Sequence, residues 1–278
     1  MSAPFADTTD ALGRPIVLAD PPTRIISLVP SLTDLLHGLG LDDEVVGLTR
    51  FCERPAGWRE AKTIVGGTKQ VDAECVARLQ PDLILANQEE NTRADVQALS
   101  AYAPVYVTDV STVDGATAMI RRMGQLVDRE QRARQTATTI TKRFAGLPDW
   151  APLSAAYLIW RDPHMTVGGD TFIHDVMRYG GFTSPWANAT RYPEITLDDL
   201  SAADLDVILC STEPFPFHQK DAFTDDLRAA CPDTPVHVVD GQCFSWYGPR
   251  LLDTPAYLRE LRATLEEPSS EGQAASHP

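Results

Sequence analysis

Short apolar runs alternate with stretches of helical periodicity through the first hundred residues. The runs RIISLVP (24–30), DEVVGLT (43–49), PDLILAN (81–87) and PVYVTD (104–109) are rich in β-branched residues, as buried strands are. The stretches LTDLLHGLG, DAECVARL and ADVQALSAY between them have the apolar spacing of helices. Strands and helices that alternate at such short intervals predict βαβ units and a parallel sheet.

This alternation stops after residue 112. From Val113 to Phe144 there is no proline, and the apolar residues between Ala116 and Val127 recur every three or four positions. The pattern predicts one helix of about 30 residues, about 45 Å long at 1.5 Å per residue. We expect this helix, with its end at residue 146, to be a rigid connector.

A second alternating block follows the predicted connector. SAAYLIW (154–160), VILCS (207–211) and PVHVVDG (235–241) are expected strands, and TPAYLRELRATL (254–265) is an amphipathic closing helix. The second block also repeats part of the first, although the similarity is weak. Each copy contains a helix, a turn and an apolar strand, and the two segments are ECVARLQPDLILAN and DDLSAADLDVILCS.

The predicted fold is therefore α/β, with two Rossmann-like lobes of parallel sheet joined by one long helix and a ligand cleft between them. The pattern divides the chain into five parts. They are an N-terminal arm or strand pair over 1–20, a first lobe over 21–112, the connecting helix over 113–146, a second lobe over 147–264 and a disordered tail over 265–278.

Composition limits the possible partners. The 278 residues carry a net charge of −15, which argues against nucleic acid and anionic membranes, and we expect a monomer that binds a small molecule. The five cysteines form no CxxC, so free thiols are expected rather than a disulfide framework or a zinc finger. The N-terminus has no basic segment followed by a long apolar one. As it stands, the chain is expected in the cytoplasm, and in the periplasm if its true start lies upstream.

The segments after the predicted strands carry the candidate site. Loops at the carboxyl ends of parallel strands line a binding crevice, and these loops are unusually rich in aromatic and charged residues. We expect a broad, partly apolar ligand. The candidate contacts are Phe51, Cys52, Lys69, Asn87, Glu89, Glu90, Asn91, Trp160, Arg161, Met165, Glu213, Phe215, Phe217, Trp246, Tyr247 and Arg250.

Catalytic and metal motifs are weak by comparison. Glu89 and Glu90 could form an acid–base pair, but neighbours in extended chain point in opposite directions, so one is expected in the cleft and the other in solvent. Cys52 and Glu213 with His164 and His218 could hold a metal, yet they have no diagnostic spacing. The glycine pairs of IVGGTK and TVGGD are interpreted as tight turns that let the backbone approach a ligand.

Four segments of the chain resemble the helical-backbone, class III, periplasmic substrate-binding proteins. They are RIISLVPSLTDLLHGLGL, ECVARLQPDLILA, TVGGDTFIHDVMRYGG and YGPRLLDTPAYL. These serve ABC importers of cobalamin, haem and ferric siderophores, and the resemblance is greatest to the vitamin B12-binding branch. It implies capture of a metal chelate without catalysis and without an intrinsic cofactor. It also implies docking on a permease through one acid on each lobe. The first acid falls on Glu74, whereas the second falls near Ser245 and is missing.

Two functions are consistent with these observations. The first is a binding protein, with Arg161 and Arg250 on anionic groups of the ligand because guanidinium forks suit carboxylate and phosphate. The second is a cytoplasmic metal- or corrinoid-handling enzyme on the same fold, which would use Cys52 and the Glu89–Glu90 loop. Cys52 follows a strand end beside Phe51 and Arg54, so we expect it to face the cleft, where a thiolate could ligate cobalt or iron.

Overall fold

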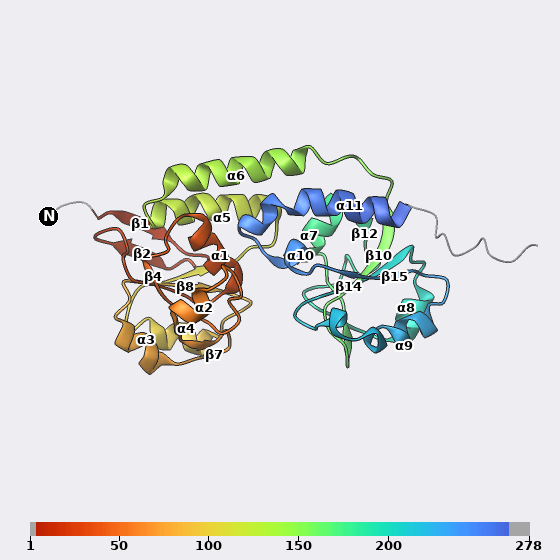
Figure 1. Ribbon diagram of the computed structural model, residues 1–278, viewed down its shortest axis with the longest axis horizontal. Coiled ribbons are helices and arrows are strands. Elements are labelled where there is room, and N and C mark those ends of the chain that lie inside the picture. The colour runs from red at the N-terminus through yellow and green to blue at the C-terminus, as the bar shows by residue number, and fades with distance from the viewer. Residues whose placement is uncertain (1–3, 267–278) are drawn as a thin grey trace, which may run out of the picture.

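The computed structural model of the protein describes residues 4–266 and has two α/β lobes side by side, the first beneath a pair of helices and the second beneath the last helix of the chain (Figure 1). The first lobe holds a five-stranded sheet in the order β5-β4-β3-β8-β9 with all pairs parallel. The strands are β3 (Ile25–Ser27), β4 (Val45–Leu48), β5 (Thr63–Ile64), β8 (Leu83–Asn87) and β9 (Val105–Thr108). Helices α1 (Pro30–Gly38), α2 (Trp58–Ala61), α3 (Ala73–Leu79) and α4 (Arg93–Leu99) connect them.

Two short antiparallel pairs are attached to this sheet. One joins β1 (Ala6–Thr9) to β2 (Pro15–Leu18) at the N-terminus, and the other joins β6 (Gly66–Gly67) to β7 (Gln70–Val71). Backbone hydrogen bonds tie the turn after β1 to β9, since Ala11 N donates to Val107 O over 3.0 Å.

The second lobe has a four-stranded parallel sheet in the order β12-β10-β14-β15. Its strands are β10 (Leu153–Leu158), β12 (Phe182–Thr183), β14 (Val207–Ser211) and β15 (Val236–Val239), and β11 (His164–Met165) pairs antiparallel with β13 (Glu194–Ile195). The helices are α7 (Phe172–Tyr179), α8 (Leu197–Ala202), α9 (Asp225–Ala230), α10 (Gln242–Ser245) and α11 (Thr254–Glu266). Three 3₁₀ turns, η1 (Phe217–Gln219), η2 (Asp221–Phe223) and η3 (Pro249–Leu252), complete it.

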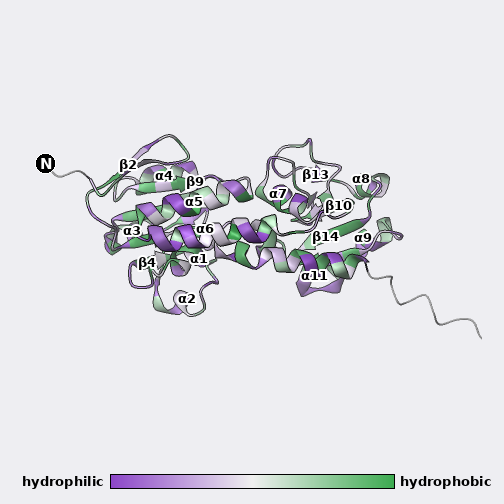
Figure 2. Ribbon diagram, turned by 90° about the horizontal axis from the view of Figure 1, so that it is seen from above, coloured by the Kyte–Doolittle hydropathy of each residue, from purple (hydrophilic) through white to green (hydrophobic). Residues whose placement is uncertain are grey.

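The prediction of one long connecting helix is wrong. The segment forms a hairpin of two helices, α5 (Val113–Leu126) and α6 (Glu130–Ala145), which lie side by side in Figures 1 and 2. Asp128 takes a left-handed conformation, with φ of 55°, and the chain reverses there. Apolar periodicity continues from α5 into α6 because both helices bury a face, so the pattern alone does not show the reversal.

The hairpin joins the two lobes at both of its open ends. At the start of α5, Val113 N donates to the Asp175 carboxylate of α7 over 2.8 Å. Near the end of α6, Phe144 packs edge-on against Tyr179 with ring centroids 4.9 Å apart. Figure 2 shows α6 mostly hydrophilic from above, which agrees with its buried stripe of Ala133, Ala137, Ile140 and Phe144 on the opposite side.

Gly124 sets the distance between α5 and α6. A Cβ added at Gly124 would stand 2.2 Å from Ala133 Cβ, so Gly124→Ala forces the two helices apart. We expect this substitution to lower the free energy of unfolding by about 1–3 kcal/mol, as overpacking does. The matched control is Gly146→Ala, because the nearest atom to its added Cβ lies at an ordinary 3.5 Å. Urea titration of both variants measures the difference, and equal stabilities would contradict the account.

Candidate ligand site between the lobes

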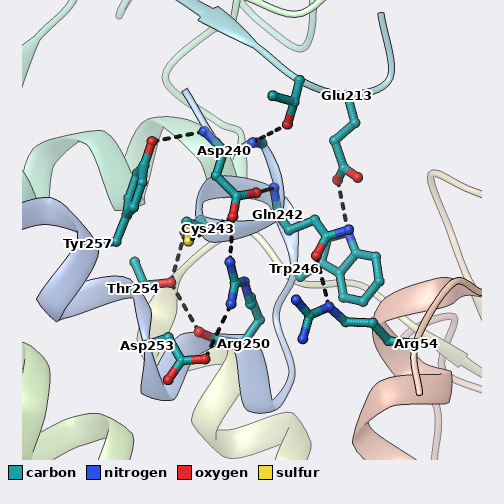
Figure 3. A network of polar contacts seen from close by, with 12 residues as sticks. Arg54, Glu213, Asp240, Gln242, Cys243, Trp246, Arg250, Asp253, Thr254 and Tyr257 are labelled. Carbon is teal, nitrogen blue, oxygen red and sulfur yellow. Dashed lines mark hydrogen bonds and ion pairs between the residues drawn. The ribbon is translucent and has the colours of Figure 1, made fainter. Parts of the chain in front are cut away.

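The loops that follow the parallel strands meet across the two lobes, as expected from the sequence. On one side, Arg54 from the loop after β4 donates through Nε to Gln242 Oε1 of α10 over 3.1 Å, a contact seen in Figure 3. On the other, Glu89 from the loop after β8 contacts Arg191 and Tyr192 of the second lobe. We call the zone between these contacts the seam.

Glu89 is one of two adjacent acids with different surroundings. Its carboxylate forms an ion pair with Arg191 and accepts a 2.9 Å hydrogen bond from the Tyr192 hydroxyl. Both partners lie in the segment before β13, which is held to the 166–170 turn by backbone bonds such as Gly168 N to Arg191 O at 2.7 Å. Glu89 therefore fastens the lobes together and is not a solvated charge.

Glu90, the second acid, forms no ion pair and accepts no side-chain hydrogen bond within residues 4–266. Its side chain is exposed to solvent, yet desolvation by the surrounding protein raises its pKa, with Lys69 opposing the rise and Glu213 adding to it. Glu213 adds to the rise because like charges repel, and it belongs to the opposite lobe.

Glu213 is held in place by its own lobe. One carboxylate oxygen, Oε1, accepts hydrogen bonds from Ser245 Oγ at 2.7 Å and from the Trp246 indole at 2.8 Å, the latter drawn in Figure 3. Burial raises the pKa of Glu213, and these two hydrogen bonds act against the rise. The result is a positioned acid with its other oxygen free of bonds from residues 4–266.

Only part of the predicted aromatic platform is accessible. Phe51 and Trp160 are 54% and 40% exposed, and half-buried Phe215 packs edge-on against Trp160 with centroids 5.7 Å apart. Phe217 is 1% exposed and belongs to the core of the second lobe, so its prediction as a ligand contact is wrong.

Three further candidates are covered by protein. Trp246 and Tyr247 are buried, and Met165 is half-buried against the core. Trp246 supports Glu213 through its indole, so its role is to position that acid.

The predicted anion-binding arginines are already ion-paired. Arg161 contacts Asp162 at 3.1 Å and Asp226 at 3.2 Å. Arg250 pairs with Asp240 and, at 3.3 Å, with Asp253, as Figure 3 shows. Within residues 4–266, Arg161 Nε and Arg250 Nε have no hydrogen-bond partner, so each guanidinium keeps an unused donor, and the assignment of the two arginines to ligand anions stays a prediction.

Asn87 and Asn91 shape the loop after β8. The Asn87 side-chain oxygen accepts bonds from Glu89 N at 2.9 Å and Glu90 N at 3.3 Å, while its amide donates to Thr108 O. Asn91 donates to Thr68 O over 2.8 Å. Both are buried, so they orient the two glutamates and do not face the seam.

Cys52 is a core residue, and its expected exposure to the cleft is wrong. The side chain is 0% exposed, with its sulfur 3.1 Å from Thr33 Oγ1 and 3.3 Å from Thr49 Oγ1. Burial raises the pKa of the thiol, which disfavours the thiolate needed for a ligand or nucleophile. The chain turns back after β4, so Cys52 lies in the core of the first lobe although it follows the end of a strand.

The possible metal cluster is also not assembled. Among residues 4–266, no group of three His, Cys, Asp or Glu side chains could hold a metal ion. His164 instead lies 3.2 Å from the Asp226 carboxylate that Arg161 contacts.

The glycine pairs allow two segments of protein backbone to lie close together. A Cβ at Gly168 or Gly169 would stand 2.3 Å or 2.1 Å from the backbone oxygens of Ala189 and Ala187. A Cβ at Gly66 would meet Gln70 O at 2.4 Å. The expectation that these turns admit a ligand is therefore wrong, because protein backbone occupies the space.

Sequence reasoning missed Arg191, Tyr192 and Gln242 as seam residues. Arg191 and Tyr192 lie just before β13, far from the carboxyl end of any strand of the main sheet. They reach the seam because the Gly168–Gly169 turn carries their segment there, which is a tertiary effect without a local sequence signal.

With this geometry, comparison with known proteins identifies the class. The chain matches the periplasmic binding protein family over residues 25–230 and belongs to it. The two-lobed architecture of the class III proteins agrees with the predicted fold class.

Individual relatives are similar but distant. A vitamin B12-binding protein of Photorhabdus laumondii is 24% identical over 196 residues, which cover 68% of this chain and 71% of that protein. An uncharacterized ABC transporter substrate-binding lipoprotein of Bacillus subtilis, YvrC, is 25% identical over 90% of this chain and 83% of its own length. A periplasmic haem-binding protein from Pseudomonas aeruginosa has a TM-score of 0.76 at 21% identity, covering 86% of this chain and 92% of that one.

These findings correct the expected location. The expectation of a cytoplasmic protein rested on the character of the N-terminus, and membership of a periplasmic family with a lipoprotein relative contradicts it. Within residues 4–266, none of the helices has both the length and the apolar character that crossing a membrane requires.

The Glu89 contact with Arg191 and Tyr192 gives a direct prediction. Glu89→Gln keeps the shape and removes the charge, so amide hydrogen exchange should speed up in residues 184–193 and 87–91. The free energy of unfolding should fall by only about 1 kcal/mol or less, because the pair is partly exposed. Glu194→Gln, on β13 and exposed, is the matched control. Exchange unchanged in both variants would show that the contact does not hold the segment.

Proposed function

We propose that this protein is the substrate-binding component of an ABC importer and that it holds a metal chelate, such as cobalamin, haem or a ferric siderophore, in the seam. Family membership and the names of the relatives support the class of function. The observation that carries the proposal is the contact between the lobes, where Arg54 meets Gln242 and Glu89 meets Tyr192, together with the exposed rings of Phe51 and Trp160. Exposed aromatic rings of this kind suit a broad, partly apolar ligand.

The protein acts by capture, without chemistry and without an intrinsic cofactor. The enzyme alternative depended on Cys52 and the Glu89–Glu90 loop. Cys52 is buried with a raised thiol pKa, and Glu89 is engaged by Arg191 and Tyr192, so neither is available as a nucleophile or base.

Ligand binding can be tested by thermal unfolding with cyanocobalamin, haemin and ferrichrome in parallel. A ligand at 100 times its Kd stabilises the native state by about 2.7 kcal/mol, a shift of about 5 °C for a chain of this size. We expect a saturable shift with at least one of the three. No shift with any of them at millimolar concentration would refute the metal-chelate assignment.

We further propose that the protein docks on the importer through Glu74 and Asp198. Ser245, near which the second docking acid was expected, lies within the seam and donates to Glu213, so it does not mark a docking surface. The weak internal repeat of the sequence indicates a different residue for the second docking acid. It aligns Glu74 with Asp198, and both are exposed at the second position of a helix, in α3 and α8.

The equivalence of these two helix starts extends to the bonds around them. Asp72 caps α3 by accepting from Cys75 N, and Thr196 caps α8 by accepting from Asp199 N. In the turn after each helix an aspartate binds the start of the central strand. Asp82 accepts from Arg24 N at 3.0 Å, and Asp206 accepts from Ser154 N at 2.7 Å. Figure 1 shows α3 and α8 on opposite lobes, on the side away from α6.

Charge reversal tests the docking proposal. Glu74→Lys or Asp198→Lys, introduced in the native host, should reduce uptake of radiolabelled cyanocobalamin at least 10-fold because a paired cation on the permease is repelled. Affinity of the purified variants for the ligand should stay unchanged, since neither residue touches the seam. Glu260→Lys, exposed on α11, is the control. Uptake equal to wild type in the Asp198 variant would remove that residue from the docking surface.

A further inference from the structure

The first lobe contains a cavity of about 480 Å³. The described residues that line it come from the turn between β1 and β2, the end of β8 and the loop after it, the edge strand β9, and helix α4. Figure 2 shows β2, α4 and β9 together on this side of the lobe. Sites for small molecules commonly measure about 300–1,000 Å³, so the cavity is large enough to hold one.

The lining is positively charged. Arg14 and Arg93 contribute guanidinium groups, and none of the described residues that line the cavity is Asp or Glu. The chain as a whole has 39 acidic residues against 24 basic ones, so the cavity differs in charge from the rest of the protein. Arg93 is exposed, and within residues 4–266 its guanidinium forms no ion pair and no hydrogen bond. An anion in the cavity would therefore meet a cation without a protein partner.

Arg14 is held in the wall of the cavity by a buried acid. The Asp10 carboxylate accepts hydrogen bonds from Arg14 Nε at 2.9 Å and from Nη2 at 2.6 Å, and Nη2 also donates to Val105 O over 2.8 Å. Among the described residues, none accepts a bond from Arg14 Nη1, so one donor nitrogen is unused. A guanidinium that is already fixed loses little side-chain freedom when it binds an anion.

The rest of the lining is uncharged and partly apolar. Leu12, Val96 and Val107 contribute aliphatic side chains, and Leu12 is 48% exposed in the turn between β1 and β2. Gln88 and Gln97 contribute carboxamides that form no side-chain hydrogen bond in the part of the chain that the structure describes. Aliphatic surface beside an unpaired guanidinium suits a ligand with an apolar body and a carboxylate.

We propose that this cavity is a second ligand site, which binds a small monocarboxylate with an aliphatic body. Arg93 binds the carboxylate, and the aliphatic side chains cover the body of the ligand. A single negative charge is favoured because Asp10 already balances Arg14, which leaves Arg93 as the net charge of the lining.

The site is distinct from the metal-chelate site proposed in the seam, although a loop connects them. Asn87 lines the cavity, and its side-chain oxygen accepts the bonds from Glu89 N and Glu90 N. A carboxylate in the cavity would therefore lie against the loop whose Glu89 fastens the two lobes.

Titration of the ¹⁵N-labelled full chain, followed by NMR, tests the site with three probes. Isovalerate has the proposed chemistry, isovaleramide is its uncharged isostere, and acetate lacks the branched aliphatic body. We expect saturable shifts of the backbone amides of residues 12–14, 88 and 93–97 with isovalerate at millimolar concentration. Isovaleramide and acetate should each bind at least about 10-fold more weakly, because the first lacks the charge and the second lacks the apolar area.

A pair of arginine variants locates the charge that is recognised. Arg93→Gln should weaken isovalerate about 10-fold, because a carboxamide cannot form a charge-assisted bond. Arg59→Gln is the matched control, since Arg59 is exposed on α2 and does not line the cavity. Both arginines are exposed, and unchanged melting temperatures would show that both variants fold.

Each outcome bears on a stated part of the proposal. Equal affinity for isovalerate and isovaleramide, or equal affinity of the two variants for isovalerate, would overturn recognition of the carboxylate by Arg93. Acetate binding as tightly as isovalerate would overturn the aliphatic contact. No saturable shift at the named residues would refute the site. All of these outcomes leave the metal-chelate proposal standing, because thermal unfolding with the chelates tests it separately.

Discussion

The close docking of the 241–253 segment on α1 fixes the position of one lobe against the other. Two glycines allow it. A Cβ at Gly38 would stand 2.6 Å from Pro249 Cγ, and a Cβ at Gly248 would stand 2.8 Å from Ser31 O. The same segment carries Trp246, Tyr247 and Arg250, so the geometry of the seam follows from this contact. Arg143 of α6 adds a 2.5 Å bond to Leu252 O, which ties the helical hairpin to the docked segment.

Such a fastened arrangement limits how the lobes can respond to a ligand. The hairpin α5–α6 joins them at one end, and the contacts of Arg54 and Glu89 join them at the seam. A ligand site held in this way is largely preformed, which lowers the ordering cost of binding. It also makes recognition depend on the charges and donors already in place, since large closure would have to break these bonds.

Most of the fold could be predicted from local patterns, whereas much of the site could not. Alternating apolar strands and amphipathic helices specified the α/β class because strand and helix periods are properties of neighbouring residues. The reversal at Asp128 escaped prediction because its sequence, LVDRE, contains neither glycine nor proline. The predicted loops after the strands do contain Cys52, Phe217, Arg161 and Arg250. Whether each of these side chains is buried or ion-paired depends on residues far along the chain.

Glu89 and Glu90 show most directly what tertiary structure adds. In sequence they are the same residue twice, and the expectation that they point in opposite directions could not assign which one faces the ligand. Asn87 fixes both backbone amides through one side-chain oxygen, so the two carboxylates leave the loop in set directions. Arg191 and Tyr192 then engage Glu89, which balances the charge of that acid, while Glu90 has no such partner within residues 4–266. The charge of this region therefore depends on which glutamate the second lobe binds. Within residues 4–266, the second lobe forms an ion pair and a hydrogen bond with Glu89 and neither with Glu90.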